Sequence, residues 1–163
     1  MRRRVKGQGS RVKVINLNKK YNLSVLFLKK IVLDILKVLK NLRGAELEVI
    51  FLDDAAIKTL NKRYRGNDSA TDVLSFLLPR LEFGEERLLG EIFISLDRAR
   101  HNARVFGTRL EDEITLYTIH GILHLAGYDD ETNLRKRFMS KRESQILEHL
   151  CKSRNLSKVL TRR

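Results

Sequence analysis

The sequence has a single cysteine, a single proline and no tryptophan among its 163 residues. One cysteine excludes an internal disulfide and a zinc site built from several thiolates, and it is typical of a reducing compartment. Long apolar runs are also missing. The most apolar stretch, residues 23–39, is interrupted by four charged side chains, so it is neither a signal-peptide core nor a membrane span. We therefore expect a cytoplasmic protein with no membrane partner.

Acidic residues are scarce at both ends of the chain. The formal net charge is +13, from 33 Lys and Arg against 20 Asp and Glu. Residues 1–20 carry eight cations and no acid, and residues 135–163 carry ten cations and two acids, whereas the part between them is slightly acidic. Such an excess favours a polyanionic partner, with nucleic acid ahead of an anionic membrane surface. The basic terminal segments, 1–20 and 152–163, are candidates for holding the phosphates of a nucleic acid.

Periodicity predicts strands and helices in mixed order, which indicates one α+β or α/β domain over residues 1–163. The expected strands are 12–16, 46–52, 73–78 (ended by Pro79) and 89–95, the last two as a hairpin. The expected helices are 24–41, 54–64, 97–107, 109–126 and 131–151. Thr108 and Glu111 suggest a capping box before the fourth helix, and Gly127 is placed to end it.

The segment from His120 to Asp130 carries the strongest chemical signal. Two histidines at i and i+4, His120 and His124, lie on one helical face, close enough to share a metal ion. Gly127 then allows a left-handed turn, and a carboxylate follows at Asp130. The spacing is that of the extended zincin pattern H-E-x-x-H-x-x-G-x-x-H.

Two positions depart from that pattern. Gly121 stands where zinc peptidases have the Glu that acts as general base, which disfavours peptide hydrolysis by that mechanism. Asp130 stands where the third histidine would be. It can ligate a metal through oxygen, but its negative charge suits harder cations somewhat better. A His/His/Asp set with open positions is still what a hydrolytic metal site needs.

Other readings of these residues remain open from sequence alone. Asp129 competes with Asp130 as ligand, and Asp130 could instead cap the final helix. His101 and His149 are expected at exposed helix positions, and Cys151 is expected to be a small packed apolar residue.

A second cluster contains Asn61, Tyr64 and Arg65 on one helical face, just before the segment Thr71-Asp-Val-Leu-Ser-Phe76. Arg65 could bind a phosphate with two hydrogen bonds and stabilise a phosphoryl transition state. It could equally be a solvated cation at a helix C-terminus, where the helix dipole favours it, and spacing alone favours this second reading.

These residues together resemble the bacterial YbeY family of endoribonucleases, or ribosomal RNA maturation factors, across roughly residues 45–150. The similarity lies in Asn61, Tyr64-Arg65, Thr71 to Phe76, Leu89-Gly-Glu-Ile92 and His120 to Asp129. It implies an α+β fold with a small mixed sheet, about five helices and a zinc site on the helix and turn. It also implies that His120 and His124 match two metal-binding histidines, and that Arg65 matches an essential arginine.

The resemblance implies a metal-dependent endoribonuclease that cuts single-stranded RNA, matures the 3′ end of small-subunit ribosomal RNA and acts in ribosome quality control. His120, His124 and Asp130 would hold one Zn²⁺, or another divalent metal, and Arg65 would bind RNA and neutralise charge. No small-molecule cofactor is expected. Two alternatives remain: a zincin-type peptidase, and a non-catalytic ribosome-associated protein with a structural metal.

Overall fold

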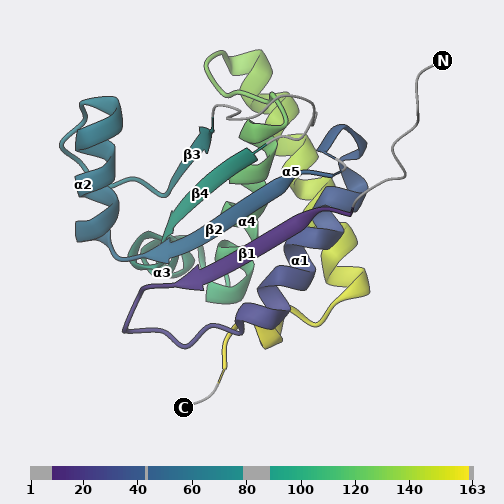
Figure 1. Cartoon of the computed structure of the whole chain (residues 1–163). Helices are drawn as coiled ribbons and strands as arrows, with labels where there is room; N and C mark the ends of the chain where they lie inside the picture. The colour runs from purple at the N-terminus through teal and green to yellow at the C-terminus, as the bar shows by residue number, and fades with distance from the viewer. Residues whose placement is uncertain (1–8, 43, 79–88, 162–163) are drawn as a thin grey trace.

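Figure 1 shows the computed structural model of the chain, which describes residues 9–42, 44–78 and 89–161. The N-terminal arginines and Pro79 lie outside these residues. The strands are β1 (Arg11–Asn16), β2 (Glu46–Leu52), β3 (Val73–Leu77) and β4 (Leu89–Ser95). The helices are α1 (Val25–Val38), α2 (Asp54–Arg65), α3 (Leu96–Phe106), α4 (Leu110–Leu125) and α5 (Asn133–Ser153), with short 3₁₀ turns η1 (Lys40–Leu42) and η2 (Leu156–Val159).

The four strands form one mixed sheet in the order β1-β2-β4-β3. β1 and β4 both run parallel to β2, whereas β3 is antiparallel to β4. The antiparallel pair confirms the predicted hairpin partnership of the last two strands. The expected α+β class, small mixed sheet and five helices are confirmed, within the part of the chain that is described.

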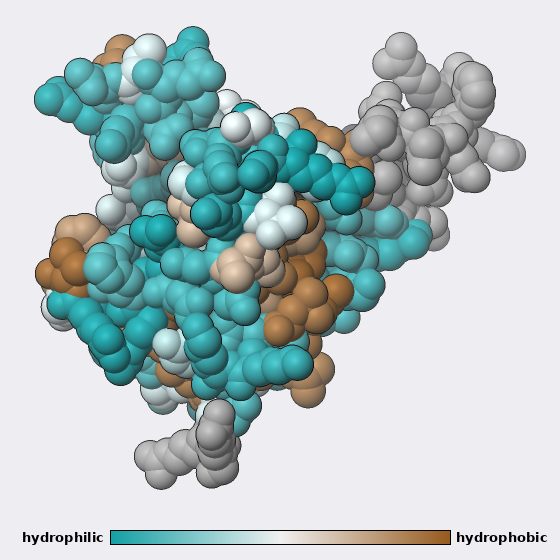
Figure 2. Space-filling view, turned by 90° about the vertical axis from the view of Figure 1, so that its left-hand side faces the viewer, coloured by the Kyte–Doolittle hydropathy of each residue, from teal (hydrophilic) through white to brown (hydrophobic). Residues whose placement is uncertain are grey.

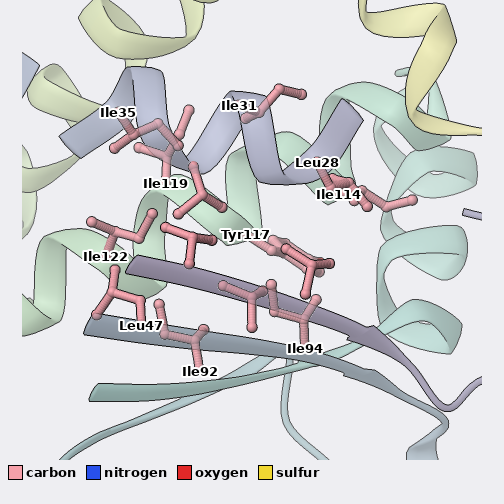
Figure 3. Packing of buried hydrophobic residues seen from close by; sticks show 14 of the residues in the cluster. Leu28, Ile31, Ile35, Leu47, Ile92, Ile94, Ile114, Tyr117, Ile119 and Ile122 are labelled. Carbon is pink, nitrogen blue, oxygen red and sulfur yellow. The ribbon is translucent and has the colours of Figure 1, made fainter. Parts of the chain in front are cut away.

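The main core lies between one face of the sheet and helices α1 and α4 (Figure 3). Leu28, Ile31 and Ile35 of α1 meet Ile119 and Ile122 of α4 over side chains of β2 and β4. α5 packs behind α4 through Met139, Ile146 and Leu150. Alternation along the strands produces this arrangement, because every second side chain points to the same face. This core fixes α4 firmly against the sheet.

A smaller apolar cluster lies on the opposite face of the sheet and holds α2. Ile57 of α2 packs on Ile50, Leu52 and Leu74, all of them buried. Asp53 caps the helix, since its Oδ1 accepts the Ala56 N–H at 2.8 Å. The position of α2 matters for the site, because its last residue is Arg65.

Two local predictions are wrong. Thr108 and Glu111 form no capping box: α4 begins at Leu110 after Arg109, and Thr108 Oγ1 instead donates to Glu113 Oε1 at 2.5 Å. Glu113 is buried, so its carboxylate needs this donor. Cys151 is exposed rather than packed, because Leu150 takes the buried position of that helical turn.

The C-terminal basic segment is part of the folded domain as far as residue 161. Leu156 and Val159 of η2 are buried in the main core, and Leu160 forms an isolated bridge with Leu23. None of the helices in the described part of the chain has both the length and the apolar character needed to cross a membrane.

Candidate metal centre

The proposed metal ligands come from the end of α4 and the turn that follows it. Most of α4 is buried, and Ile119, Ile122 and Leu123 fix its rotation by packing into the core. His120 and His124 then fall together on the remaining, half-buried face. The helix packing therefore places two imidazoles side by side.

The turn after α4 brings Asp130 to the two histidines. Gly127 has a φ of +94°, the left-handed conformation that glycine adopts without strain, and the Tyr128 N–H donates back to the Leu123 carbonyl at 3.0 Å. His120, His124 and Asp130 each present a ligand atom, and these three atoms lie within 4.8 Å of one another. The sequence spacing thus predicted a cluster that the fold forms.

The structure also shows the surroundings of the two aspartates, which favour Asp130 over Asp129 as the metal ligand. Asp129 uses both oxygens elsewhere: Oδ2 accepts from Arg135 at 2.9 Å and Oδ1 from the Glu131 N–H at 3.2 Å. The cap of α5 is Thr132, whose side chain accepts the Arg135 N–H, so Asp130 is not the helix cap. Asp130 is left free to face the histidines.

Each histidine is oriented through its Nδ1 atom. His124 Nδ1 lies 3.1 Å from the Tyr128 carbonyl oxygen, and His120 Nδ1 lies 2.6 Å from Glu143 Oε1 of α5. A carbonyl and an ionised carboxylate only accept hydrogen bonds, so both Nδ1 atoms carry the proton. The Nε2 atoms are then the ring nitrogens that remain available to a metal ion.

The two Nε2 atoms lie 2.9 Å apart. Two unprotonated nitrogens at this distance repel, so the pair either shares a proton or binds one cation with both rings. Burial, with the nearby His120 second, lowers the pKa of His124, which favours the neutral form that binds metals. Nitrogen and carboxylate donors at this spacing fit Zn²⁺ or a similar divalent cation.

Glu143 is the site residue that sequence reasoning missed. Its side chain is only 15% exposed and it holds His120 from the neighbouring helix. A carboxylate that accepts from a ligand histidine fixes the ring and increases its basicity. The available signal was helical spacing: Glu143 shares the buried face of α5 with Met139, Ile146 and Leu150.

Gly121 has a packing role at the position where a zinc peptidase carries its Glu. A Cβ atom added there would lie 2.5 Å from Ile92 Cγ2 and 3.2 Å from both Ser75 Oγ and Val73 Cγ1. Ser75 Oγ also donates to the Gly121 carbonyl at 3.1 Å. Glycine therefore allows α4 to approach β3 and β4 closely, and a glutamate side chain has no space here.

Arg65 lines the same hollow as His124. This hollow, of about 370 Å³, is lined by Arg65, Ser75, Leu77, His124, Leu125, Gly127, Tyr128 and Asp129. Figure 2 shows the surface hollowed between the lobe of α2 and the upper lobe that holds the start of α5, with mostly hydrophilic side chains around it. Arg65 itself is exposed. The fold therefore brings together a guanidinium and a metal-binding cluster that are distant in sequence.

Asn61 and Tyr64, which share a helical face with Arg65, fix the end of α2. The Asn61 amide is buried and donates to the Ser69 carbonyl at 2.8 Å, closing the turn before β3. The Tyr64 ring packs on Phe76 of β3 with ring centroids 5.3 Å apart. These contacts position Arg65 over β3.

Fold and site together define an α+β protein whose helix–turn unit presents two histidines and a carboxylate to a divalent cation, opposite an arginine. Comparison with known proteins identifies the family within this class. A family model described as Endoribonuclease YbeY matches residues 13–151, so the chain belongs to the YbeY family.

The relatives support this assignment over most of the chain. The Endoribonuclease YbeY of Desulforamulus reducens is 43% identical over 133 residues, covering 76% of this chain and 86% of the relative. That of Caldanaerobacter subterraneus is 41% identical over 118 residues, covering 64% of this chain and 73% of the relative. The solution structure of TM1509 from Thermotoga maritima superposes with a TM-score of 0.61 at 28% identity, covering 87% of this chain and 90% of that one.

Proposed function

We propose that this protein is a metal-dependent endoribonuclease that cuts single-stranded RNA. The observation that carries the proposal is the cluster of His120, His124 and Asp130, whose ligand atoms lie within 4.8 Å of one another. His124 of this cluster lines a hollow together with Arg65. The family name of the relatives supports the reaction class. A divalent cation supplies positive charge that polarises a phosphodiester and lowers the pKa of water.

The residues of the chain have distinct roles in this proposal. His120, His124 and Asp130 would hold one Zn²⁺ per chain, while Glu143 and the Tyr128 carbonyl orient the two imidazoles through their Nδ1 atoms. Arg65 would donate to the phosphate that enters the hollow and stabilise the negative charge that grows on its oxygens. The set carries one negative charge that three histidines would lack, so other divalent cations are also suitable.

We further propose that the substrate is ribosomal RNA of the small subunit, matured at its 3′ end, and that the protein acts in ribosome quality control in the cytoplasm. Support comes from the family relationship and from the basic surface of the chain. A zincin-type peptidase is disfavoured, because Gly121 lies against Ile92 and leaves no space for a general-base side chain.

The test compares cleavage of a single-stranded RNA by the zinc-loaded protein, the chelated protein and His124→Ala. We expect chelation and His124→Ala to abolish cleavage, because each removes the cation, and Arg65→Gln to lower kcat on the order of 100-fold. His149→Ala removes an exposed histidine outside the site and serves as the matched control.

Three results would contradict the proposal in different ways. Full activity in the metal-free protein would exclude a metal-dependent mechanism. Casein hydrolysis with RNA left intact would favour the peptidase alternative. Unfolding on metal removal, in a protein that never cuts RNA, would identify a structural metal in a non-catalytic protein.

A further inference from the structure

The first half of α5 is an exposed surface rich in cations. No acidic residue occurs between positions 132 and 142, whereas Arg135, Lys136, Arg137, Lys141 and Arg142 all lie there. The top of the molecule in Figure 2, where Figure 1 places the start of α5, is mostly hydrophilic. We call residues 134–142 the α5 ridge.

Most of these cations have no counter-ion in the described structure. Arg135 pairs with Asp129, but no ion pair joins Lys136, Arg137 or Lys141 to any described residue. Several cations elsewhere are paired: Lys20, for example, pairs with Asp97 of α3 at 2.9 Å. The ridge therefore retains its positive charge for an external anion.

An aromatic side chain lies in the middle of this charge. Phe138 is 61% exposed, and Leu134, one turn earlier on the same face, is 64% exposed. In a helix the surface neighbours of a residue are those three and four positions away. For Phe138 these include Leu134, Arg135, Lys141 and Arg142. An exposed ring among cations is the arrangement that binds single-stranded nucleic acid, by stacking bases and pairing phosphates.

The ridge is continuous with the metal site. Glu143, the next residue along α5, contacts His120, and Arg135 pairs with Asp129, which lines the hollow with Arg65. Phe138 is five residues from Glu143, or about 7.5 Å along the helix axis. A strand whose phosphate occupies the hollow can therefore extend directly over the ridge.

We propose that the α5 ridge binds the single-stranded RNA substrate beside the cleaved phosphodiester, with a base stacked on Phe138 and phosphates on Lys141 and Arg142. This rests on the proposed endoribonuclease function and assigns it a substrate-binding surface. RNA is favoured over an anionic membrane because the ridge has only two exposed large apolar side chains, one turn apart, rather than an apolar face along its length.

The test measures binding of a single-stranded oligonucleotide that contains 2-aminopurine, in the presence of chelator so that no cleavage occurs. We expect Phe138→Ala to weaken binding about 5- to 100-fold, the effect of losing one stacked base, and to abolish the fluorescence quenching on binding. Phe138→Trp should restore both. Lys141→Gln with Arg142→Gln should reduce the slope of log Kd against log salt by about 1.4.

Two control variants match these changes elsewhere on the surface. Phe106→Ala removes an equally exposed phenylalanine at the end of α3, and Lys29→Gln with Lys30→Gln removes two exposed cations of α1. Equal effects of test and control variants, unchanged binding by Phe138→Ala, or equal affinity for duplex RNA would each overturn the proposal. So would ridge variants that lose binding to anionic vesicles but keep RNA binding.

The outcome separates this inference from the proposed function. If the zinc-loaded protein cuts RNA but Phe138→Ala binds it normally, RNA binding by the α5 ridge is excluded and the proposed endoribonuclease function is retained. If Phe138→Ala weakens RNA binding but the zinc-loaded protein never cuts RNA, the α5 ridge is an RNA-binding surface and the proposed endoribonuclease function is wrong.

Discussion

At the scale of single residues, metal binding depends on how the two histidine rings are oriented. His120 and His124 both bind a cation through Nε2 only when these atoms are unprotonated, and hydrogen bonds at Nδ1 hold each ring in the orientation that presents Nε2. One of these bonds comes from the local turn and the other from a different helix. Glu143 therefore connects the ligand set to α5, and its loss should affect metal affinity more than folding.

We expect Glu143→Gln to weaken zinc binding about 10- to 100-fold, because the amide replaces a charged acceptor and no longer fixes the ring as strongly. Competition against a chelating dye measures this. Glu148→Gln, an exposed position on the same helix that pairs with Lys152, is the control and should bind zinc normally. Equal zinc affinities of Glu143→Gln and the wild type would show that Glu143 has no such role.

Sequence could predict the helix–turn residues of the site, but not the contact that Glu143 of α5 makes with them. His120, His124, Gly127 and Asp130 are close in sequence, so helical geometry and one turn bring them together. Glu143 is 23 residues from its partner, and its placement depends on how α5 packs on α4. No local pattern encodes that contact.

At the scale of elements, the close approach of α4 to the sheet sets the site. Gly121 lies against Ile92 of β4, and Gly90 of the same strand lies against Leu125, since a Cβ there would be 2.6 Å from Leu125 Cδ1. Two glycines, one on each element, therefore leave space for the Ile92 and Leu125 side chains of the facing element and let helix and strands approach closely. This packing brings the histidines near β3 and Arg65.

We expect Gly121→Ala to lower the free energy of unfolding by about 1–3 kcal/mol, because the added methyl group overpacks against Ile92. Urea denaturation measures the change. Gly9→Ala is the control, since nothing lies within 4 Å of the added Cβ, and it should have almost no effect. An unchanged unfolding midpoint for Gly121→Ala would mean that α4 can move away from the sheet at little cost.

Element positions were predictable because they depend on local periodicity, and the predicted pairing of the last two strands was correct because they are neighbours in sequence. The parallel pairs were not predicted. β2 pairs with β4 across α2 and β3, and no pattern within either strand specifies that partner. The predicted capping box of α4 fails for a similar reason, since Thr108 is bonded to the buried Glu113 rather than to the helix end.

At the scale of the whole molecule, some basic side chains form ion pairs within the fold, whereas others have no ion-pair partner in the described part of the chain. The terminal excess suggested RNA binding, yet Lys13 pairs with Glu48 of β2 and Arg154 with Asp34 of α1. These cations hold distant segments of the chain together. Among the residues that the structure describes, the α5 ridge is where basic side chains without ion-pair partners gather next to the site.

The Asp34–Arg154 pair makes stability depend on pH. Partial burial alone would raise the pKa of Asp34, but hydrogen bonds from Arg154 and Lys37 outweigh burial and hold that pKa below its ordinary value. A carboxyl with a lowered folded-state pKa stabilises the fold above its unfolded pKa of about 3.9, and the stabilisation is lost as the pH falls through the folded-state value.

We therefore expect Asp34→Asn to lower the free energy of unfolding by about 1 kcal/mol at pH 7, with a difference from wild type that shrinks toward pH 3. Thermal unfolding as a function of pH measures this. Glu48→Gln breaks a more exposed pair and should cost less. If the difference in free energy of unfolding between Asp34→Asn and wild type stays constant from pH 7 to pH 3, the ionised Asp34 carboxylate is not its cause.

The central claim is that one cation, held by His120, His124 and Asp130, makes this chain an RNA-cutting enzyme. The most direct measurement is the rate of single-stranded RNA cleavage while zinc is titrated into the metal-free protein. The account predicts no cleavage without metal, a rate that rises in proportion to added zinc and a plateau at one ion per chain. A rate that is independent of zinc, or a plateau that His124→Ala reproduces, would contradict it.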